Sequence, residues 1–194
     1  MSPTNNSECW GRAVHFISIG EPDKARMLCE NKLCSGMVEC RRYLGWLYYE
    51  KGDMEKSFNW FAEAAEQDDG ESLFGIGSIY ASQKNFLDAL RYFESSANHG
   101  YVRSYQWIAG LYQHGCGMPR DIEKAIEYYK MGAAQGYVMA ERSLIDIASQ
   151  RGNVIVKLLS ILKLIFLQLK TVKIAYRNVN DLRLADVQKR RATR

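Results

Sequence analysis

The chain has 194 residues and a net charge of +4, and 47% of its residues are hydrophobic and 25% charged. This composition is typical of a soluble globular protein with one or two domains. The polar residues 1–7 lack the basic and apolar regions of a secretory signal, so we expect a cytoplasmic protein. The five cysteines are an odd number, which argues against a complete disulfide framework, and we expect reduced thiols.

The charge is divided unevenly along the chain. Residues 154–194 carry ten Lys and Arg but two Asp, whereas residues 1–153 have a net charge of −4. We therefore expect a helical repeat domain over residues 1–153, followed by a basic, apolar C-terminal helix and tail over residues 154–194. A basic segment on a mildly acidic body indicates an anionic partner for that segment.

A short pattern of apolar and small residues recurs along the chain. Tyr48 and Tyr80 are 32 residues apart, as are Phe61 and Phe93, and Tyr129 follows Phe93 after 36 residues. A period of this length indicates a solenoid of stacked helix pairs. The pattern occurs as Leu44-Gly45-Trp46-Leu47-Tyr48, Ile76-Gly77-Ser78-Ile79-Tyr80 and Ile108-Ala109-Gly110-Leu111-Tyr112.

Apolar residues spaced at i, i+3, i+4 and i+7 predict nine helices before the basic segment. The expected helices span residues 8–18, 22–33, 38–50, 54–66, 70–82, 86–97, 102–114, 121–133 and 138–150. The first two form a divergent first repeat, because Phe16 and Lys24 stand 32 residues before Tyr48 and Lys56.

Each first helix carries one small residue at an equivalent position, namely Gly45, Gly77 or Ala109. We expect this residue to let the second helix approach closely. The aromatic pairs of the second helices, such as Trp60-Phe61, are expected to bridge to the next repeat, each contributing about 1.5–3 kcal/mol when fully buried.

The third repeat contains the most specific stretch, which runs Leu111-Tyr112-Gln113-His114-Gly115-Cys116-Gly117-Met118-Pro119-Arg120-Asp121-Ile122-Glu123-Lys124-Ala125. Its glycines allow a tight turn, and Asp121 can cap the following helix. The stretch resembles the Sel-one-like repeat (SLR) family, a relative of the tetratricopeptide repeats, with the pattern LGxLYxxGxGVxxDxxKAxxYYxKAAxxG. Met118 stands where that family prefers Val, and Ala109-Gly110 shifts the family's glycine by one. The resemblance covers residues 38–150 well and residues 8–33 weakly.

The resemblance implies an all-α fold, a right-handed α-solenoid of stacked antiparallel helix pairs with about four to five repeats. The residues after the repeats predict a basic, amphipathic C-terminal helix. Proteins of this family assemble complexes, often at membranes and sometimes in cell-envelope pathways. The resemblance therefore implies a non-catalytic scaffold or adaptor that binds a partner protein in its concave groove.

Motifs for catalysis, cofactors or metals are not found in the sequence. The three histidines form no His-x-x-x-His pair, and no phosphate-binding glycine loop or nucleophile elbow occurs. Cys29, Cys34 and Cys40 are spaced by five and six residues, which fits no common zinc pattern. We predict no catalytic residue, no cofactor and no metal site, and therefore no enzyme.

The predicted partner-binding groove lies along the first helices, which line the concave wall of a helical-repeat solenoid. Large aromatic residues and arginines at the groove-facing positions are of the types enriched at binding hot spots. The alternative, that Trp46, Tyr49 and Phe74 pack between neighbouring first helices, stays open. The predicted groove residues are Trp10, Arg42, Trp46, Tyr49, Phe74, Arg103, Gln106 and Arg142.

Residues 154–176 predict one further helix, about 35 Å long and so long enough to cross a bilayer. Lys163 near its centre costs about 3 kcal/mol in a membrane, and the other polar residues of the segment offset most of the remaining gain from its apolar residues. Three alternatives stay open: a helix that caps the solenoid, a helix that docks on an anionic membrane surface or a partner, and a true span.

Docking would make the protein peripheral on the cytoplasmic membrane face. Nucleic-acid binding is not expected, because no aromatic stacking platform accompanies the basic residues. The predicted lipid- or partner-docking residues are Lys157, Lys163, Lys170, Lys173 and Arg177.

Overall fold

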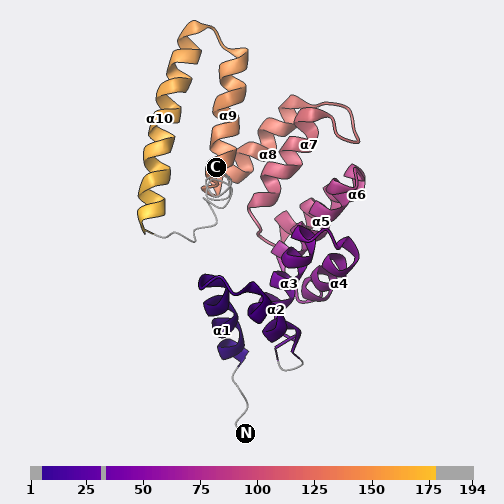
Figure 1. The fold of residues 1–194 in the computed structure, drawn as a ribbon. Coiled ribbons are helices and arrows are strands. Elements are labelled where there is room, and N and C mark those ends of the chain that lie inside the picture. Colours follow the sequence, from indigo (N-terminus) through magenta and orange to yellow (C-terminus); the bar gives the residue numbers. More distant parts are fainter. Residues whose placement is uncertain (1–5, 32–33, 178–194) are drawn as a thin grey trace. The chain divides into compact units, whose positions relative to one another are not determined.

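The computed structural model describes residues 6–31 and 34–177, and every regular element in these ranges is an α-helix (Figure 1). The predicted all-α fold is confirmed. The elements are α1 (Asn6–Ser18), α2 (Pro22–Glu30), α3 (Val38–Glu50), α4 (Met54–Ala65), α5 (Gly70–Ser82), α6 (Phe86–Asn98), α7 (Arg103–His114), α8 (Ile122–Ala134), α9 (Val138–Arg151) and α10 (Val154–Arg177).

The helices belong to two compact units, which meet in the sequence between Tyr101 and Val102. The first unit contains the pairs α1–α2, α3–α4 and α5–α6, and the second contains α7–α8 and α9–α10. Each pair corresponds to one predicted repeat. The predicted boundary after residue 153 falls in the short turn between α9 and α10 and stays a prediction.

Aspartate residues begin three of the helices by capping them. The side chains of Asp53, Asp69 and Asp121 accept the backbone N–H three residues further on, at 3.1, 2.9 and 2.9 Å. Such a cap satisfies one of the N–H groups that have no partner inside the helix. At the other end of α7, Gly115 has φ +68°, a left-handed conformation that glycine adopts without strain. The predicted cap at Asp121 is confirmed.

Phe61 fills the space between two repeats. Its ring is fully buried and lies against Gly45 on α3 and Gly75 on α5, within 2.5 Å of where a Cβ on either glycine would stand. Phe93 lies against Gly77 in the same way. At Gly45 and Gly77 the small residue of the first helix therefore lies directly against an aromatic ring of the second helix. The predicted close approach at these residues is confirmed, as is the predicted bridge from Phe61 to the next repeat.

A lysine from the second helix covers the aromatic ring that ends the repeated pattern. The ammonium groups of Lys56 and Lys124 lie 5.3 and 4.3 Å from the ring centres of Tyr48 and Tyr112. A cation over an aromatic face is attracted to the negative face of the ring. These contacts explain why the tyrosine and the lysine occur together in these two repeats.

One disulfide joins Cys9 to Cys34 in the first unit, so the expectation of reduced thiols is wrong for these two residues. The bond connects α1 with the segment that precedes α3. Cys29 and Cys40 are buried free thiols in the same core, and Cys116 is a free thiol in the second unit. The disulfide could not be predicted, because an odd cysteine count says nothing about which residues the fold brings together.

Helix α10 packs alongside α9 as an antiparallel hairpin (Figure 1). Leu167 of α10 is buried with Val138 of α9, and Ile145 and Ile174 pack against them. The segment is thus the second helix of the last repeat, which is the capping alternative. Within the described ranges, no helix combines the length and the apolar character needed to cross a bilayer.

Candidate partner-binding surface

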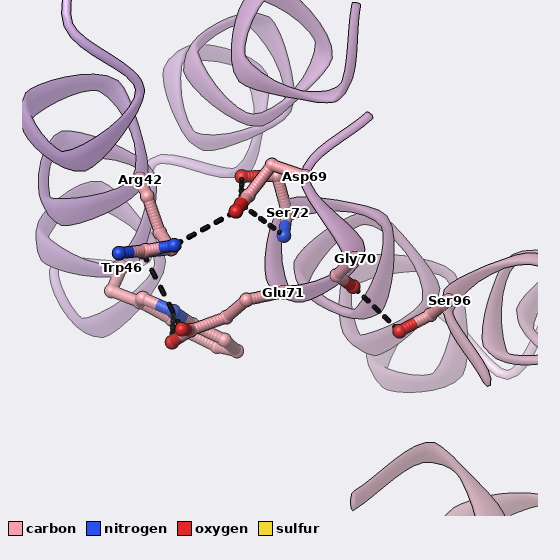
Figure 2. A network of polar contacts seen from close by, with 7 residues as sticks. All are labelled: Arg42, Trp46, Asp69, Gly70, Glu71, Ser72 and Ser96. Atoms are coloured by element: carbon pink, nitrogen blue, oxygen red, sulfur yellow. Dashed lines mark hydrogen bonds and ion pairs between the residues drawn. The ribbon is translucent and has the colours of Figure 1, made fainter. Parts of the chain in front are cut away.

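Arg42 on α3 is held by two carboxylates at the start of α5 (Figure 2). Its Nη1 lies 2.8 Å from Asp69 Oδ1, and its Nε lies 3.4 Å from Glu71 Oε2. Asp69 is simultaneously the cap of α5, because its other oxygen accepts the backbone N–H and the hydroxyl of Ser72. The carboxylates also lie at the positive end of the helix dipole, which favours negative charge. The predicted groove residue Arg42 therefore links two neighbouring first helices.

Trp46 lies one turn after Arg42 and belongs to the same network. Its indole N–H donates to Glu71 Oε1 at 3.1 Å, and its ring packs edge-on against Phe61, with ring centres 5.0 Å apart. Tyr49, one turn further along α3, packs edge-on against Trp46 and donates its hydroxyl to the Ser78 carbonyl at 3.5 Å. Both aromatic side chains are half-buried, so part of each remains on the surface.

Phe74 does not line a groove, contrary to the prediction. Its side chain is 1% exposed and packs against Trp46, Phe93 and Tyr101. The packing alternative therefore holds at this position. The physical reason is that Trp46 of the preceding first helix covers the ring from one side, while Phe93 on α6 and Tyr101 just after α6 cover it as well.

Trp10 on α1 also contacts the next first helix, at the start of the first unit. It is half-buried, and its ring centre lies 6.2 Å from that of Tyr43 on α3. Trp10, Arg42 and Trp46 thus share one property, which is that each joins consecutive first helices. We define the first-helix surface as the half-buried side chains Glu39, Arg42, Trp46, Tyr49 and Glu71.

The predicted groove residues of the second unit lie on α7 and α9. Gln106 donates to the Ser143 hydroxyl at 3.1 Å and so joins these two helices. Arg142 forms a long ion pair of 3.9 Å with Asp146 one turn later and is exposed. Arg103 is half-buried at the start of α7. Their role in partner binding stays a prediction.

Asp69 is the residue of this network that sequence reasoning missed. It stands directly before Gly70, the first residue of α5. Its role as a cap was detectable, because aspartate is common at the position just before a helix begins. Its bond to Arg42 was not detectable, because the two residues are 27 positions apart in the sequence.

The basic residues of α10 lie on its exposed sides. Lys157, Lys163 and Lys173 are exposed, and Lys170 pairs with Glu141 of α9. The side chain of Arg177 lies outside the described residues. Lys163 and Lys170 also border an open groove of about 540 Å³ between α9 and α10, whose floor includes Leu144, Ile145 and Leu167.

The outward side of α10 is more apolar than the side that packs on α9. Its side chains toward α9 include the buried polar residues Ser160 and Thr171. The exposed apolar residues, each at least half exposed, are Val154, Ile155, Leu158, Leu159, Ile161, Leu162, Ile165, Phe166, Leu169 and Val172. Exposed apolar side chains in such number are typical of surfaces that contact a protein or a membrane.

Antiparallel helix pairs, with an aromatic ring seated against small residues of the next repeat, define a helical-repeat protein of the tetratricopeptide-like class. The profile of the Sel1 repeat matches residues 38–69, 71–101 and 104–137, which together are half of the chain. The chain therefore belongs to the Sel1 repeat family, as its resemblance to the SLR pattern predicted. Helices α1, α2, α9 and α10 lie outside the matched residues.

Two curated relatives match shorter parts of the chain. An F-box protein of Arabidopsis thaliana is 33% identical over 73 residues, which are 37% of this chain and 21% of the relative. Chitin synthase regulatory factor 3 of Schizosaccharomyces pombe is 28% identical over 95 residues, which are 46% of this chain and 10% of the relative. The chain thus corresponds to a small part of these longer proteins.

Solved structures of the same repeat type share the fold. A Sel1 repeat protein from Oxalobacter formigenes superimposes with a TM-score of 0.64 at 24% identity, covering 75% of this chain and 64% of that one. The protective antigen c5321 of uropathogenic Escherichia coli, which has an SLR fold, gives 0.65 at 25% identity and covers 77% and 35%. Proteins built from Sel1 repeats generally act as non-catalytic scaffolds for protein interactions.

Proposed function

We propose that this protein is an adaptor that holds a partner protein on the first-helix surface of its first unit. The observation that supports this proposal best is the network of Arg42, Trp46 and Glu71, which fixes polar and aromatic side chains at a half-buried surface. Side chains that are already ordered lose little conformational entropy when a partner binds, and tryptophan and arginine dominate many interfaces.

The charges of this surface indicate the chemistry of the partner. Asp69 and Glu71 share one guanidinium, that of Arg42, and Glu39 stands three residues before Arg42 on α3, so the surface has an excess of negative charge. Trp46 and Tyr49 supply aromatic area beside these carboxylates. We therefore propose that the partner contributes a segment with basic and apolar side chains, whose association weakens as the salt concentration rises.

A matched pair of charge reversals tests this assignment. Glu39 and Glu55 both lie in the first turn of their helices, so the helix-dipole cost of replacing them by lysine is similar. With the partner identified by affinity capture from the native organism, Glu39→Lys is expected to weaken binding about tenfold. Glu55→Lys is expected to leave it nearly unchanged. Equal affinities of the two variants would remove the first-helix surface as the binding site.

A second function, docking on an anionic membrane surface, is favoured by α10. The apolar outward side of this helix is accompanied by exposed lysines, as in interfacial helices that bind anionic lipid. Such docking would recruit the repeat units to a membrane.

Vesicle flotation with the full chain tests the second function without removing α10, whose loss would uncover Val138 on α9. Leu162→Glu places a charge on the outward side, where residue 162 is 53% exposed, and so should leave the packing on α9 intact. We expect binding to vesicles that contain phosphatidylserine, and loss of that binding in the variant. Equal flotation of both proteins, or none for either, would exclude lipid docking by α10.

A further inference from the structure

Four of the five cysteines gather in the core of the first unit. Cys9, Cys29, Cys34 and Cys40 are all buried in one cluster with Ala13, Ala25 and Leu44. Cys9 and Cys34 are joined as a disulfide, whereas Cys29 on α2 and Cys40 on α3 are free. Among the described residues, no group of three or more His, Cys, Asp or Glu is placed to hold a metal ion.

Cys29 and Cys40 are direct neighbours across the junction of the first and second repeats. Both side chains are 0% exposed and belong to one buried cluster, on the packed helices α2 and α3. Hydrogen bonding between the two thiols raises the pKa of Cys29 and lowers the pKa of Cys40. Cys40 is thus the member of the pair that is more easily ionised, and the thiolate is the form that attacks disulfides.

The later repeats have other residue types at the positions equivalent to Cys29 and Cys40. One repeat later, 32 residues on, Phe61 stands at the position of Cys29, and Phe93 stands there again after another 32. At the position of Cys40 the later repeats have the buried serines Ser72 and Ser104. Only at the first junction does a thiol replace both the aromatic ring and the serine.

We propose that Cys29 and Cys40 form a redox-active dithiol that closes a second disulfide, between α2 and α3. The oxidant is a small-molecule disulfide such as oxidised glutathione. The Cys40 thiolate attacks one sulfur of the oxidant, forming a mixed disulfide and releasing one small thiol. Cys29 then loses its proton and attacks the Cys40 sulfur, which releases the second small thiol. Two protein thiols are oxidised, and one small disulfide is reduced to two thiols.

The second disulfide would fasten the first repeat to the second. In the reduced protein this junction includes the hydrogen bond from the Tyr48 hydroxyl to Glu30 at 2.7 Å and the contact of Trp10 with Tyr43. A covalent link across this junction lowers the conformational entropy of the unfolded chain and so stabilises the packing of α2 on α3. Because Trp10 borders the same junction, the redox state would set how firmly the start of the first unit is held.

The experiment uses the full chain and oxidised glutathione in moderate urea, which lets the buried thiols open transiently. The remaining thiols are then alkylated under denaturing conditions, and the disulfides are mapped by mass spectrometry. Cleavage after Glu21, Glu30 and Glu39 places Cys9, Cys29, Cys34 and Cys40 on separate peptides and makes the assignment unambiguous. We expect a Cys29–Cys40 linked peptide and a higher thermal midpoint for the oxidised protein, with Cys116 found alkylated or as its mixed disulfide with glutathione.

Two variants control the assignment. Cys40→Ser introduces the residue found at the equivalent positions Ser72 and Ser104, so it should fold, and it is expected to lose the linked peptide and the oxidant-induced rise in midpoint. Cys116→Ser is expected to keep both. Alkylation of both Cys29 and Cys40 after oxidation of the full chain would overturn the proposal, as would a link from either one to Cys9, Cys34 or Cys116.

Discussion

The ring of Phe61 lies so close to Gly45 that a Cβ on this glycine would stand 2.5 Å from Phe61 Cδ1. Real Cβ atoms are not found at such distances, so residue 45 must be glycine for the ring to take this place. The same ring lies equally close to Gly75 on the next first helix. One aromatic side chain therefore sets the distance between α3, α4 and α5, which carry the first-helix surface.

Gly45→Ala should destabilise the first unit by about 1–3 kcal/mol, because the added methyl group overpacks the contact with Phe61. Thermal or urea unfolding of the variant measures this cost. In the double variant Gly45→Ala, Phe61→Leu the two effects should couple by about 1 kcal/mol or more, because the smaller side chain makes room for the methyl group. Strict additivity would show that the contact with Phe61 is not the cause.

Gly110→Ala is the matched control and should have the opposite sign. Gly110 lies within α7, and nothing stands within 4 Å of where its Cβ would be. Alanine in a helix loses less conformational freedom on folding than glycine, so we expect a stabilisation of about 0.5–1 kcal/mol. We assign Ala109, and not Gly110, as the equivalent of Gly45 and Gly77 in this repeat. If Gly110→Ala lowers the stability measured by urea unfolding, that assignment is wrong.

Arg42→Met should destabilise the first unit by about 1–2 kcal/mol, because it leaves Asp69 and Glu71 without their shared cation. The side chains of Arg42 and Glu71 are each 26% exposed, so solvent only partly screens the attraction between their charges. Glu71→Gln should cost less. A double-mutant cycle in urea unfolding is expected to give a coupling of about 0.5–1.5 kcal/mol between the two positions. A coupling near zero would show that the pair adds nothing to stability.

Asp53→Asn should make the free energy of unfolding depend less on pH in the acidic range. The ammonium and the backbone N–H of Lys56 lower the pKa of Asp53 from its ordinary value of 3.8 in the folded protein. The stabilising effect is therefore complete above pH 3.8 and is lost as the pH falls through the lower folded pKa. Asparagine keeps the cap but does not titrate, so urea unfolding should show a gap between wild type and variant that narrows in acid. A gap of constant size would contradict this coupling.

The repeat pattern predicted the helices, and their close approach at Gly45 and Gly77, because both depend on residues with fixed spacing. Gly45 and Phe61 recur as Gly77 and Phe93, and each pair meets inside one repeat. The predicted helix over residues 22–33 ends earlier, at Glu30. That end was not predictable, because the first repeat departs from the pattern of the others.

The candidate site was only partly predictable. The spacing located Arg42 and Trp46 on the side of α3 that contacts the next first helix, but it could not distinguish exposure from packing, which buries Phe74. Asp69 and the Cys9–Cys34 disulfide depend on contacts between residues at least 25 positions apart. A single sequence without the structure does not show such contacts.

Carboxyl labelling of the full chain, with and without its captured partner, tests the proposed binding surface most directly. A carbodiimide modifies exposed carboxylates, and mass spectrometry reads the extent at each position. We expect the partner to protect Glu39 and Glu71 on the first helices, while Glu55 and Glu63 on α4 are labelled as before. Unchanged labelling of Glu39 and Glu71 in the complex, or protection confined to α4, would contradict the proposal that the first-helix surface holds the partner.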